Sequence, residues 1–126
     1  MCVGKNVLII DDNEDNLFLL RLILEILGCD VRSASNGEEG IAKVYRAVPD
    51  LIILDLMMPD ISGIEVIERL KANRQLPYIP IMLLTANAEL FRGEAIALCD
   101  ELFYKPFDVE HLLSTIKLLL SPKQIF

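Results

Sequence analysis

Two short apolar runs that end at aspartate residues restrict the fold of this chain more than any other feature. Residues 7–10 are followed at once by Asp11 and Asp12, and residues 51–54 are followed at once by Asp55. An apolar run without polar alternation is typical of a strand that is covered on both faces, as in a parallel sheet. The sequence therefore predicts an α/β protein with carboxylates at the ends of two buried strands.

Segments with helical periodicity separate the apolar runs along the whole chain. The expected strands are residues 7–10, 30–35, 51–54, 79–84 and 101–104. The expected helices are residues 14–27, 38–47, 64–73, 89–98 and 109–120. This alternation predicts one domain over residues 1–126, a (βα)5 chain that right-handed crossovers wind into a doubly wound three-layer sandwich. Ligands bind such sheets at the carboxyl ends of the strands.

Charge and hydropathy argue against several classes of function. The chain has 12 Lys and Arg residues against 19 Asp and Glu residues, and its formal net charge of −7 would repel a nucleic-acid backbone. Charged residues interrupt every apolar stretch before it reaches the roughly 20 residues that a membrane span needs. Residues 1–6 lack the pattern of a secretory signal. We therefore expect a cytoplasmic protein that binds neither nucleic acid directly nor a membrane.

The three cysteines indicate neither a disulfide framework nor a zinc site. Cys2, Cys29 and Cys99 are odd in number, far apart in the sequence and without a Cys-x-x-Cys pair. We interpret them as buried or incidental thiols, so the function is expected to lie with the aspartates.

The aspartates predict a magnesium site that suits phosphoryl chemistry. Asp11, Asp12 and Asp55 follow strands whose carboxyl ends lie at one edge of the predicted sheet, so we expect them to lie close together. Like charges in one cleft raise the pKa of at least one carboxyl group unless a cation neutralises them. Mg²⁺ prefers oxygen ligands, and an aspartate can itself be the nucleophile that forms an aspartyl phosphate. Thr85 and Lys105 follow two further strands, and their hydroxyl and ammonium groups are suitable donors to a phosphoryl oxygen.

Taken together, these residues resemble the response-regulator receiver family, the CheY-like domains of two-component signalling, over about the whole chain. The resemblance rests on Asp11-Asp12, Asp55, Met58-Pro59-Asp60-Ile61-Ser62-Gly63, Thr85-Ala86 and Lys105-Pro106-Phe107, in that order. It implies a flavodoxin-like fold with strand order 2-1-3-4-5. It also implies a signalling module rather than an enzyme, with at most Mg²⁺-dependent self-phosphorylation and self-dephosphorylation.

The resemblance assigns a role to each site residue. Asp55 would be the phosphoacceptor, and Thr85 and Lys105 would contact the phosphoryl group. The Mg²⁺ ligands would be Asp11, Asp12, Asp55 and the backbone carbonyl of Met57. The partners implied are a sensor histidine kinase or histidine phosphotransfer protein as donor and a downstream protein as target. A homodimer is a further possibility.

One departure from the family pattern keeps other functions open. The family often has an aromatic switch residue three positions before the lysine, where this chain has Leu102, and strand alternation predicts that Phe103 points to the opposite face. A phosphorylation-independent adaptor therefore remains an alternative, as does a receiver excised from a hybrid histidine kinase. A phosphatase of the haloacid dehalogenase type is disfavoured, because it needs a second aspartate two residues after the nucleophile, where this chain has Met57.

The helix expected over residues 14–27 is apolar on more than one face. Phe18, Leu22 and Ile26 form a stripe at four-residue spacing beside the positions that would face the sheet. This surplus indicates either a partner surface or a broad core face with a few exposed side chains, and the sequence leaves both interpretations open.

Overall fold

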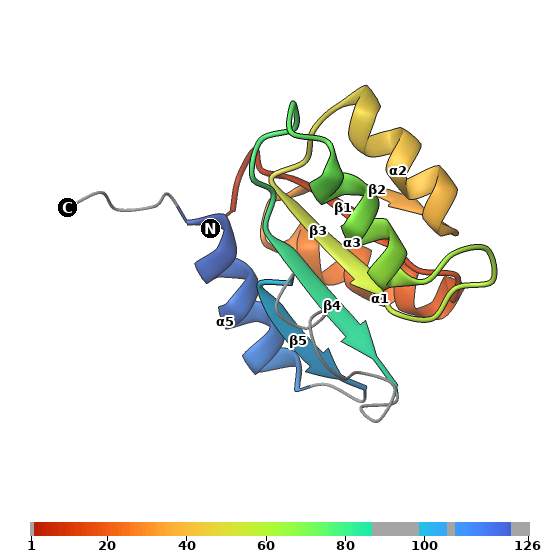
Figure 1. Ribbon diagram of the computed structural model, residues 1–126. Coiled ribbons are helices and arrows are strands. Elements are labelled where there is room, and N and C mark those ends of the chain that lie inside the picture. The colour runs from red at the N-terminus through yellow and green to blue at the C-terminus, as the bar shows by residue number, and fades with distance from the viewer. Residues whose placement is uncertain (1, 87–98, 106–107, 122–126) are drawn as a thin grey trace.

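Five apolar segments form one parallel sheet, and helices pack on both of its faces (Figure 1). The computed structural model describes residues 2–86, 99–105 and 108–121. The strands are β1 (Asn6–Ile10), β2 (Asp30–Ala34), β3 (Leu51–Asp55), β4 (Ile81–Thr85) and β5 (Glu101–Tyr104). The described helices are α1 (Glu14–Ile26), α2 (Gly37–Arg46), α3 (Gly63–Ala72) and α5 (Val109–Leu120). The helix predicted over residues 89–98 lies outside the described residues.

The strand order is β2-β1-β3-β4-β5 and every pairing is parallel, which confirms the flavodoxin-like doubly wound topology. The fourth strand begins at Ile81 rather than at residue 79. Pro80 precedes it, and proline has no N–H to donate to a neighbouring strand. The Pro80 carbonyl still accepts a hydrogen bond of 3.0 Å from the Ile52 N–H. Asp55 and Thr85 are the last residues of β3 and β4, so these strands extend one residue past their predicted ends.

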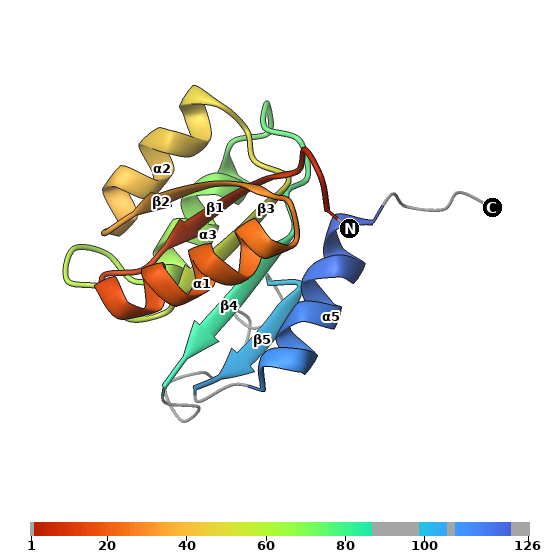
Figure 2. The same cartoon turned by 180° about the vertical axis from the view of Figure 1, so that it is seen from behind.

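The alternation of side chains along each strand divides the core into two clusters. In β1, Val7 and Ile9 belong to the cluster under α1 and α5, whereas Leu8 and Ile10 belong to the cluster under α2 and α3. Figures 1 and 2 show these two pairs of helices on opposite faces of the sheet. All four side chains are fully buried, and complete burial of such a side chain contributes about 1.5–3 kcal/mol. Burial on both faces explains why the central strands β1, β3 and β4 are made of nearly continuous apolar runs.

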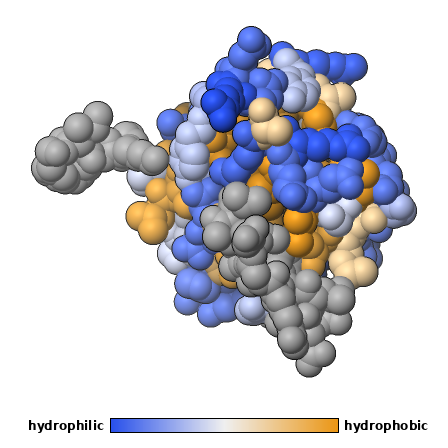
Figure 3. Space-filling model, in the orientation of Figure 1, coloured by the Kyte–Doolittle hydropathy of each residue, from blue (hydrophilic) through white to orange (hydrophobic). Residues whose placement is uncertain are grey.

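Polar side chains fix where the helices begin. Each described helix has an N-cap side chain that accepts a hydrogen bond from a backbone N–H of the first turn, and these caps are Asn13, Asn36, Ser62 and Asp108. The face seen in Figure 3 carries many hydrophilic residues with apolar ones between them. Within the described ranges, no helix is long and apolar enough to span a membrane.

The start of α3 is packed tightly against the end of β3. A Cβ atom added at Gly63 would lie 2.5 Å from the backbone oxygen of Asp55 and 3.0 Å from the Cα of Leu56. The Gly63 N–H also donates a hydrogen bond of 2.7 Å to the Leu56 carbonyl. Glycine at this position therefore lets α3 begin directly beside the strand that carries Asp55.

We expect Gly63→Ala to lower the free energy of unfolding by about 1–3 kcal/mol, because backbone atoms cannot yield to the added methyl group without a shift. Urea denaturation followed by circular dichroism would measure this. The matched control is Glu68→Ala at an exposed position of the same helix, which should change stability by no more than about 0.5 kcal/mol. Equal stability of the two variants would contradict the close packing of Gly63.

Candidate functional site

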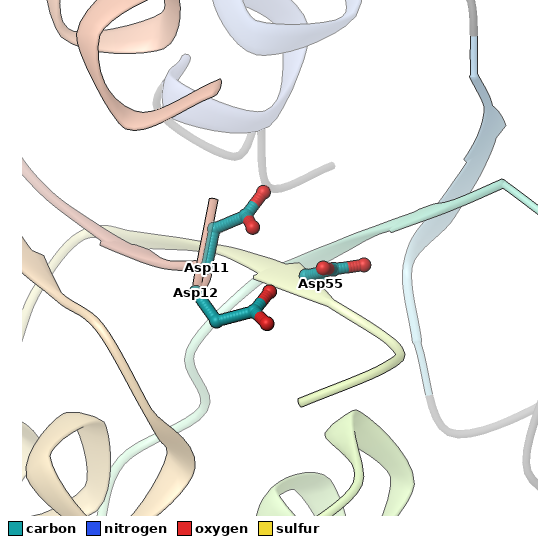
Figure 4. Close-up of side chains that lie close together, drawn as sticks. All are labelled: Asp11, Asp12 and Asp55. Atoms are coloured by element: carbon teal, nitrogen blue, oxygen red, sulfur yellow. The ribbon is translucent and has the colours of Figure 1, made fainter. Parts of the chain in front are cut away.

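The pairing of β1 with β3 brings the three aspartates together. Ile10 is paired with Leu54, so Asp11 and Asp55, each one residue further, lie side by side at the carboxyl edge of the sheet. One carboxylate oxygen from each of Asp11, Asp12 and Asp55 lies within 4.8 Å of the others, as Figure 4 shows. Asp11 and Asp55 are buried, with 1% and 7% of their surface exposed, whereas Asp12 is exposed. The predicted acidic cluster is therefore present, with two members inside the protein and one at its surface.

Lys105 provides the positive charge of this cluster. Its Nζ lies 3.5 Å from Oδ2 of Asp11 and 3.7 Å from Oδ1 of Asp55, although the side chain starts at the end of β5, two strands away from β3. The backbone holds it there, because the Lys105 N–H donates a hydrogen bond of 2.7 Å to the Thr85 carbonyl. Since the side chain of Lys105 is only 19% exposed, water screens its attraction to the carboxylates less than it would at the surface.

Asp11 is also held by the first turn of α1. Its carboxylate accepts hydrogen bonds from the Asn13 N–H at 2.9 Å and from Nδ2 of Asn16 at 3.3 Å. These contacts fix a carboxylate that has almost no access to solvent. They also connect the acidic cluster directly to the N-terminus of α1.

The electrostatic surroundings raise the pKa of Asp55 from 3.8 to about 6. Burial is the largest cause, and the negative charge of Asp11 is the second. The charge of Lys105 and the hydrogen bond from the Met57 N–H act in the opposite direction. Asp55 is thus ionised at neutral pH, but burial and Asp11 disfavour its ionised form. A further cation or cationic group bound beside it would stabilise the ionised carboxylate.

The loop after β3 is attached to α2. Asp60 accepts hydrogen bonds from the N–H groups of Gly37 and Glu38, at 3.0 and 2.8 Å, and thereby adds a second cap to the N-terminus of α2. Arg69 of α3 supports the same junction through its 2.7 Å ion pair with Glu38. This role of Asp60 was not predicted from the sequence, because its partners are more than 20 residues away and no local sequence pattern indicates them.

Met57 has a backbone beside the site and a side chain that is turned outward. Its N–H lies 3.4 Å from Oδ1 of Asp55, and its side chain is 57% exposed. The side chain borders a shallow hollow of about 260 Å³ whose lining residues are Leu56, Met57, Met58, Ser62 and Ile64. The predicted metal contact would use the backbone carbonyl of Met57 and would not involve its side chain. The exposed apolar side chain can therefore make other contacts.

Thr85 and the strand residues near Lys105 lie as alternation predicts. Thr85 is fully buried at the end of β4 and is paired with Tyr104. Leu102 is half-buried and packs against the cluster under α2 and α3, whereas Phe103 is buried in the opposite cluster. The prediction that Leu102 and Phe103 point to opposite faces is confirmed. Phe103 packs edge-to-face against His111, with ring centroids 4.9 Å apart.

The donor set at this edge fits Mg²⁺. Hard cations of this size take oxygen ligands and are usually held by one or two carboxylates, with water or phosphate oxygens completing the coordination. Asp11, Asp12 and Asp55 supply carboxylate oxygens within one ion's reach, and no histidine or thiol accompanies them in the cluster. The donor set of this cluster therefore suits a magnesium ion.

A family model described as the response regulator receiver domain matches residues 7–117 of the chain. The chain belongs to this family. This receiver is thus a signalling module of a two-component system rather than an enzyme, as the sequence analysis predicts. The acidic cluster of Asp11, Asp12 and Asp55 is typical of the magnesium-binding site of such domains.

The receiver is similar to proteins of different lengths. It is 36% identical to the alkaline phosphatase synthesis transcriptional regulatory protein PhoP of Bacillus subtilis, over 98% of the receiver and 51% of PhoP. It is also 36% identical to the polar-differentiation response regulator DivK of Brucella anthropi, over 93% of the receiver and 97% of DivK. The chain therefore spans about half the length of PhoP and nearly all of DivK.

A solved structure with the same fold was crystallised as a magnesium complex. The response regulator protein TrrA of Thermotoga maritima, crystallised in complex with Mg²⁺ and BeF, matches the receiver with a TM-score of 0.83 and 33% identity. The match covers 91% of the receiver and 98% of TrrA.

The pKa of Asp55 predicts how stability depends on pH. Because that pKa lies above its ordinary value, the folded chain binds more protons than the unfolded chain between about pH 4 and pH 6, and stability falls as pH rises through this window. Without Mg²⁺, we expect Asp55→Asn to raise the free energy of unfolding by about 1–2 kcal/mol at about pH 7.5 and by less at about pH 4.5.

Urea denaturation in the presence of a chelator would measure both values, and saturating Mg²⁺ should reduce the difference by stabilising the native chain alone. Asp12→Asn is the matched control, since Asp12 is exposed and its removal should have a smaller effect. If the native chain is as stable as Asp55→Asn at neutral pH without metal, the ionised carboxylate of Asp55 does not destabilise the fold and the prediction is wrong.

Proposed function

We propose that this receiver accepts a phosphoryl group on Asp55 from a phosphohistidine of a sensor histidine kinase or a histidine phosphotransfer protein. The observation that carries the proposal is the buried carboxylate of Asp55, which lies beside the carboxylate of Asp11 and 3.7 Å from the ammonium group of Lys105. Family membership implies the histidine kinase partner. The phosphorylated domain, acting as one unit over residues 1–126 in the cytoplasm, then signals through contacts with a downstream protein.

The transfer exchanges one bond to phosphorus for another. A carboxylate oxygen of Asp55 attacks the phosphorus atom, and the bond from phosphorus to the histidine nitrogen breaks, so that the imidazole leaves with the electron pair and takes up a proton. Lys105 follows the phosphoryl group with its flexible ammonium, and the hydroxyl of Thr85 donates to a second phosphoryl oxygen. Because Asp55 has a pKa of about 6, it is available as the ionised nucleophile at neutral pH.

Mg²⁺, bound by the carboxylates of Asp11, Asp12 and Asp55 and the backbone carbonyl of Met57, would neutralise the charge of the phosphoryl oxygens. The acidic donor set supports this assignment. The magnesium complex of TrrA supports it independently.

The proposal predicts a mass change that depends on Asp55 and on the metal. Incubation with acetyl phosphate and Mg²⁺ should add one phosphoryl group to the native chain and none to Asp55→Asn, since amide nitrogen and oxygen are poor nucleophiles here. Intact-mass spectrometry under mild acid would detect it, and a chelator should abolish the gain. The control Asp60→Asn keeps the acceptor and should still be phosphorylated. A gain of equal size in Asp55→Asn, or no gain in the native chain, would overturn the assignment.

The outer face of α1 is the surface that we propose for the phosphodonor. Phe18 and Ile26 are each 70% exposed and Leu22 is 48% exposed, which favours the partner-surface interpretation over the broad core face. Arg21 interrupts the stripe but is directed toward β2, where it donates to the Val31 carbonyl at 3.1 Å. The helix begins next to Asp12, so a partner seated on this face would have its histidine close to the acidic cluster.

The double variant Phe18→Ser with Ile26→Ser should therefore slow phosphotransfer from a histidine donor by at least about tenfold, the equivalent of 1.4 kcal/mol. A panel of purified, phosphorylated histidine kinase domains would supply the donor. Labelling by acetyl phosphate should not change, because it needs no docking surface. Leu118→Ser on α5 is the matched control, since Leu118 is 71% exposed on another helix.

Transfer rates that equal those of the native chain would remove α1 as the docking face. Sedimentation velocity of the same variants tests a second copy of the chain as the occupant, because loss of self-association in the double variant alone would identify a homodimer.

Leu102 favours one second candidate, a phosphorylation-independent adaptor that signals through constitutive binding. The half-buried aliphatic side chain stands where the family often has an aromatic switch, so coupling between Thr85 and the output surface is in question. A downstream protein that binds the native chain and Asp55→Asn equally well would favour the adaptor. Preferential binding of the phosphorylated chain would favour the switch.

A further inference from the structure

Two of the three cysteines lie side by side at the amino edge of the sheet, opposite the acidic cluster. Cys2 precedes β1 and Cys29 precedes β2, and these two strands are neighbours. A turn closed by a hydrogen bond of 3.2 Å from the Lys5 N–H to the Cys2 carbonyl folds the first residues back toward the end of α1. From the sequence the cysteines are interpreted as buried or incidental thiols, since 27 positions separate this pair in the chain.

Backbone hydrogen bonds hold the two segments against each other. The Cys2 N–H donates to the Leu27 carbonyl at 3.0 Å, and the Gly4 N–H donates to the Gly28 carbonyl at 3.3 Å. On the other side, the Asp30 N–H donates to the Lys5 carbonyl at 2.8 Å. Cys29 therefore lies within a short stretch that is bonded at both ends to the segment carrying Cys2.

The two thiols share one buried environment. Cys2 and Cys29 are each 6% exposed and belong to the core cluster under α1 and α5. Burial raises the pKa of Cys29 to about 11, and the adjacent Cys2 contributes through its charge and through a hydrogen bond between the side chains. Cys99 packs against the cluster on the opposite face of the sheet.

We propose that Cys2 and Cys29 form an oxidant-responsive dithiol that closes to an intramolecular disulfide. The oxidant is a peroxide, which reaches Cys2 when the few backbone bonds of residues 2–5 open. Hydrogen peroxide oxidises the Cys2 thiol to a sulfenic acid and is itself reduced to water. The Cys29 sulfur then attacks the Cys2 sulfur, the S–S bond forms, and the sulfenic oxygen leaves as a second water with the thiol proton.

The surroundings assign the order of these steps. Cys29 stays a thiol until Cys2 is oxidised, because its high pKa leaves little reactive thiolate at neutral pH. Once formed, the disulfide would close a covalent ring from residue 2 to residue 29 that contains β1, α1 and the acidic residues Asp11 and Asp12. The cross-link itself would lie at the amino edge of the sheet, whereas the acidic cluster lies at the carboxyl edge.

The test uses the variant Cys99→Ser, which leaves the pair alone in the chain. Treatment with hydrogen peroxide should remove two hydrogens from the intact mass, block both thiols against alkylation in denaturant and join the peptides that carry residues 2 and 29. The oxidised domain should form no disulfide between chains and should melt about 5–10 °C higher, since a cross-link of this span restricts the unfolded chain. Dithiothreitol should reverse each change.

Cys2→Ser and Cys29→Ser in the same background are the matched controls, and neither should show the mass loss or the gain in melting temperature. Circular dichroism confirms that they fold, and Cys29→Ala replaces Cys29→Ser if the buried hydroxyl is not tolerated. Peroxide that leaves only sulfenic or sulfinic acid on the Cys99→Ser chain, or that links two chains, would overturn the proposal. These readouts are independent of phosphorylation, so the proposal stands or falls separately from the function of Asp55.

Discussion

The parallel pairing of β1 with β3 is the constraint on which the rest of this receiver depends. Residues 7–10 and 51–54 are paired one to one, and each residue contributes its side chain to one of two buried clusters. A slip of one residue would exchange the two faces of a strand and would separate Asp11 from Asp55. The packing of the core thus fixes the register, and the register fixes the acidic site.

The ionised acidic site lowers the stability that the core provides. Burial and the negative charge of Asp11 on the neighbouring strand together raise the pKa of Asp55 to about 6. Lys105 offsets part of this increase from the end of β5, at 3.5 and 3.7 Å from the two carboxylates. Neighbouring segments keep the site in place. Asn13 and Asn16 donate hydrogen bonds to Asp11, and the loop after β3 is attached to α2 through Asp60. Binding of a cation, or of a phosphoryl group together with its cation, would therefore stabilise this site.

The sequence allowed prediction of the features that local patterns and strand polarity determine. The five strands, the convergence of Asp11, Asp12 and Asp55, and the opposite directions of Leu102 and Phe103 follow from apolar runs, from the common edge of parallel strands and from alternation. Contacts that depend on the path of a loop or a turn could not be predicted from the sequence. The capping of α2 by Asp60 depends on the path of a loop, and the contact of Cys2 with Cys29 depends on a turn before β1. The start of β4 was misplaced because the missing N–H of Pro80 outweighed the apolar character of Ile79.

The acidic site and the outer face of α1 differ in how closely they depend on the core. Asp55 cannot be changed without altering the electrostatics of the interior, because it is buried beside Asp11 and Lys105. Phe18 and Ile26 are mostly solvent-exposed and contribute little to the core, while Leu20 and Leu24 of the same helix anchor it to the sheet. Exposed apolar groups gain little from folding and much from association. One helix thus combines a buried face that the fold requires with an exposed apolar face that could change without loss of the core or of the acidic site.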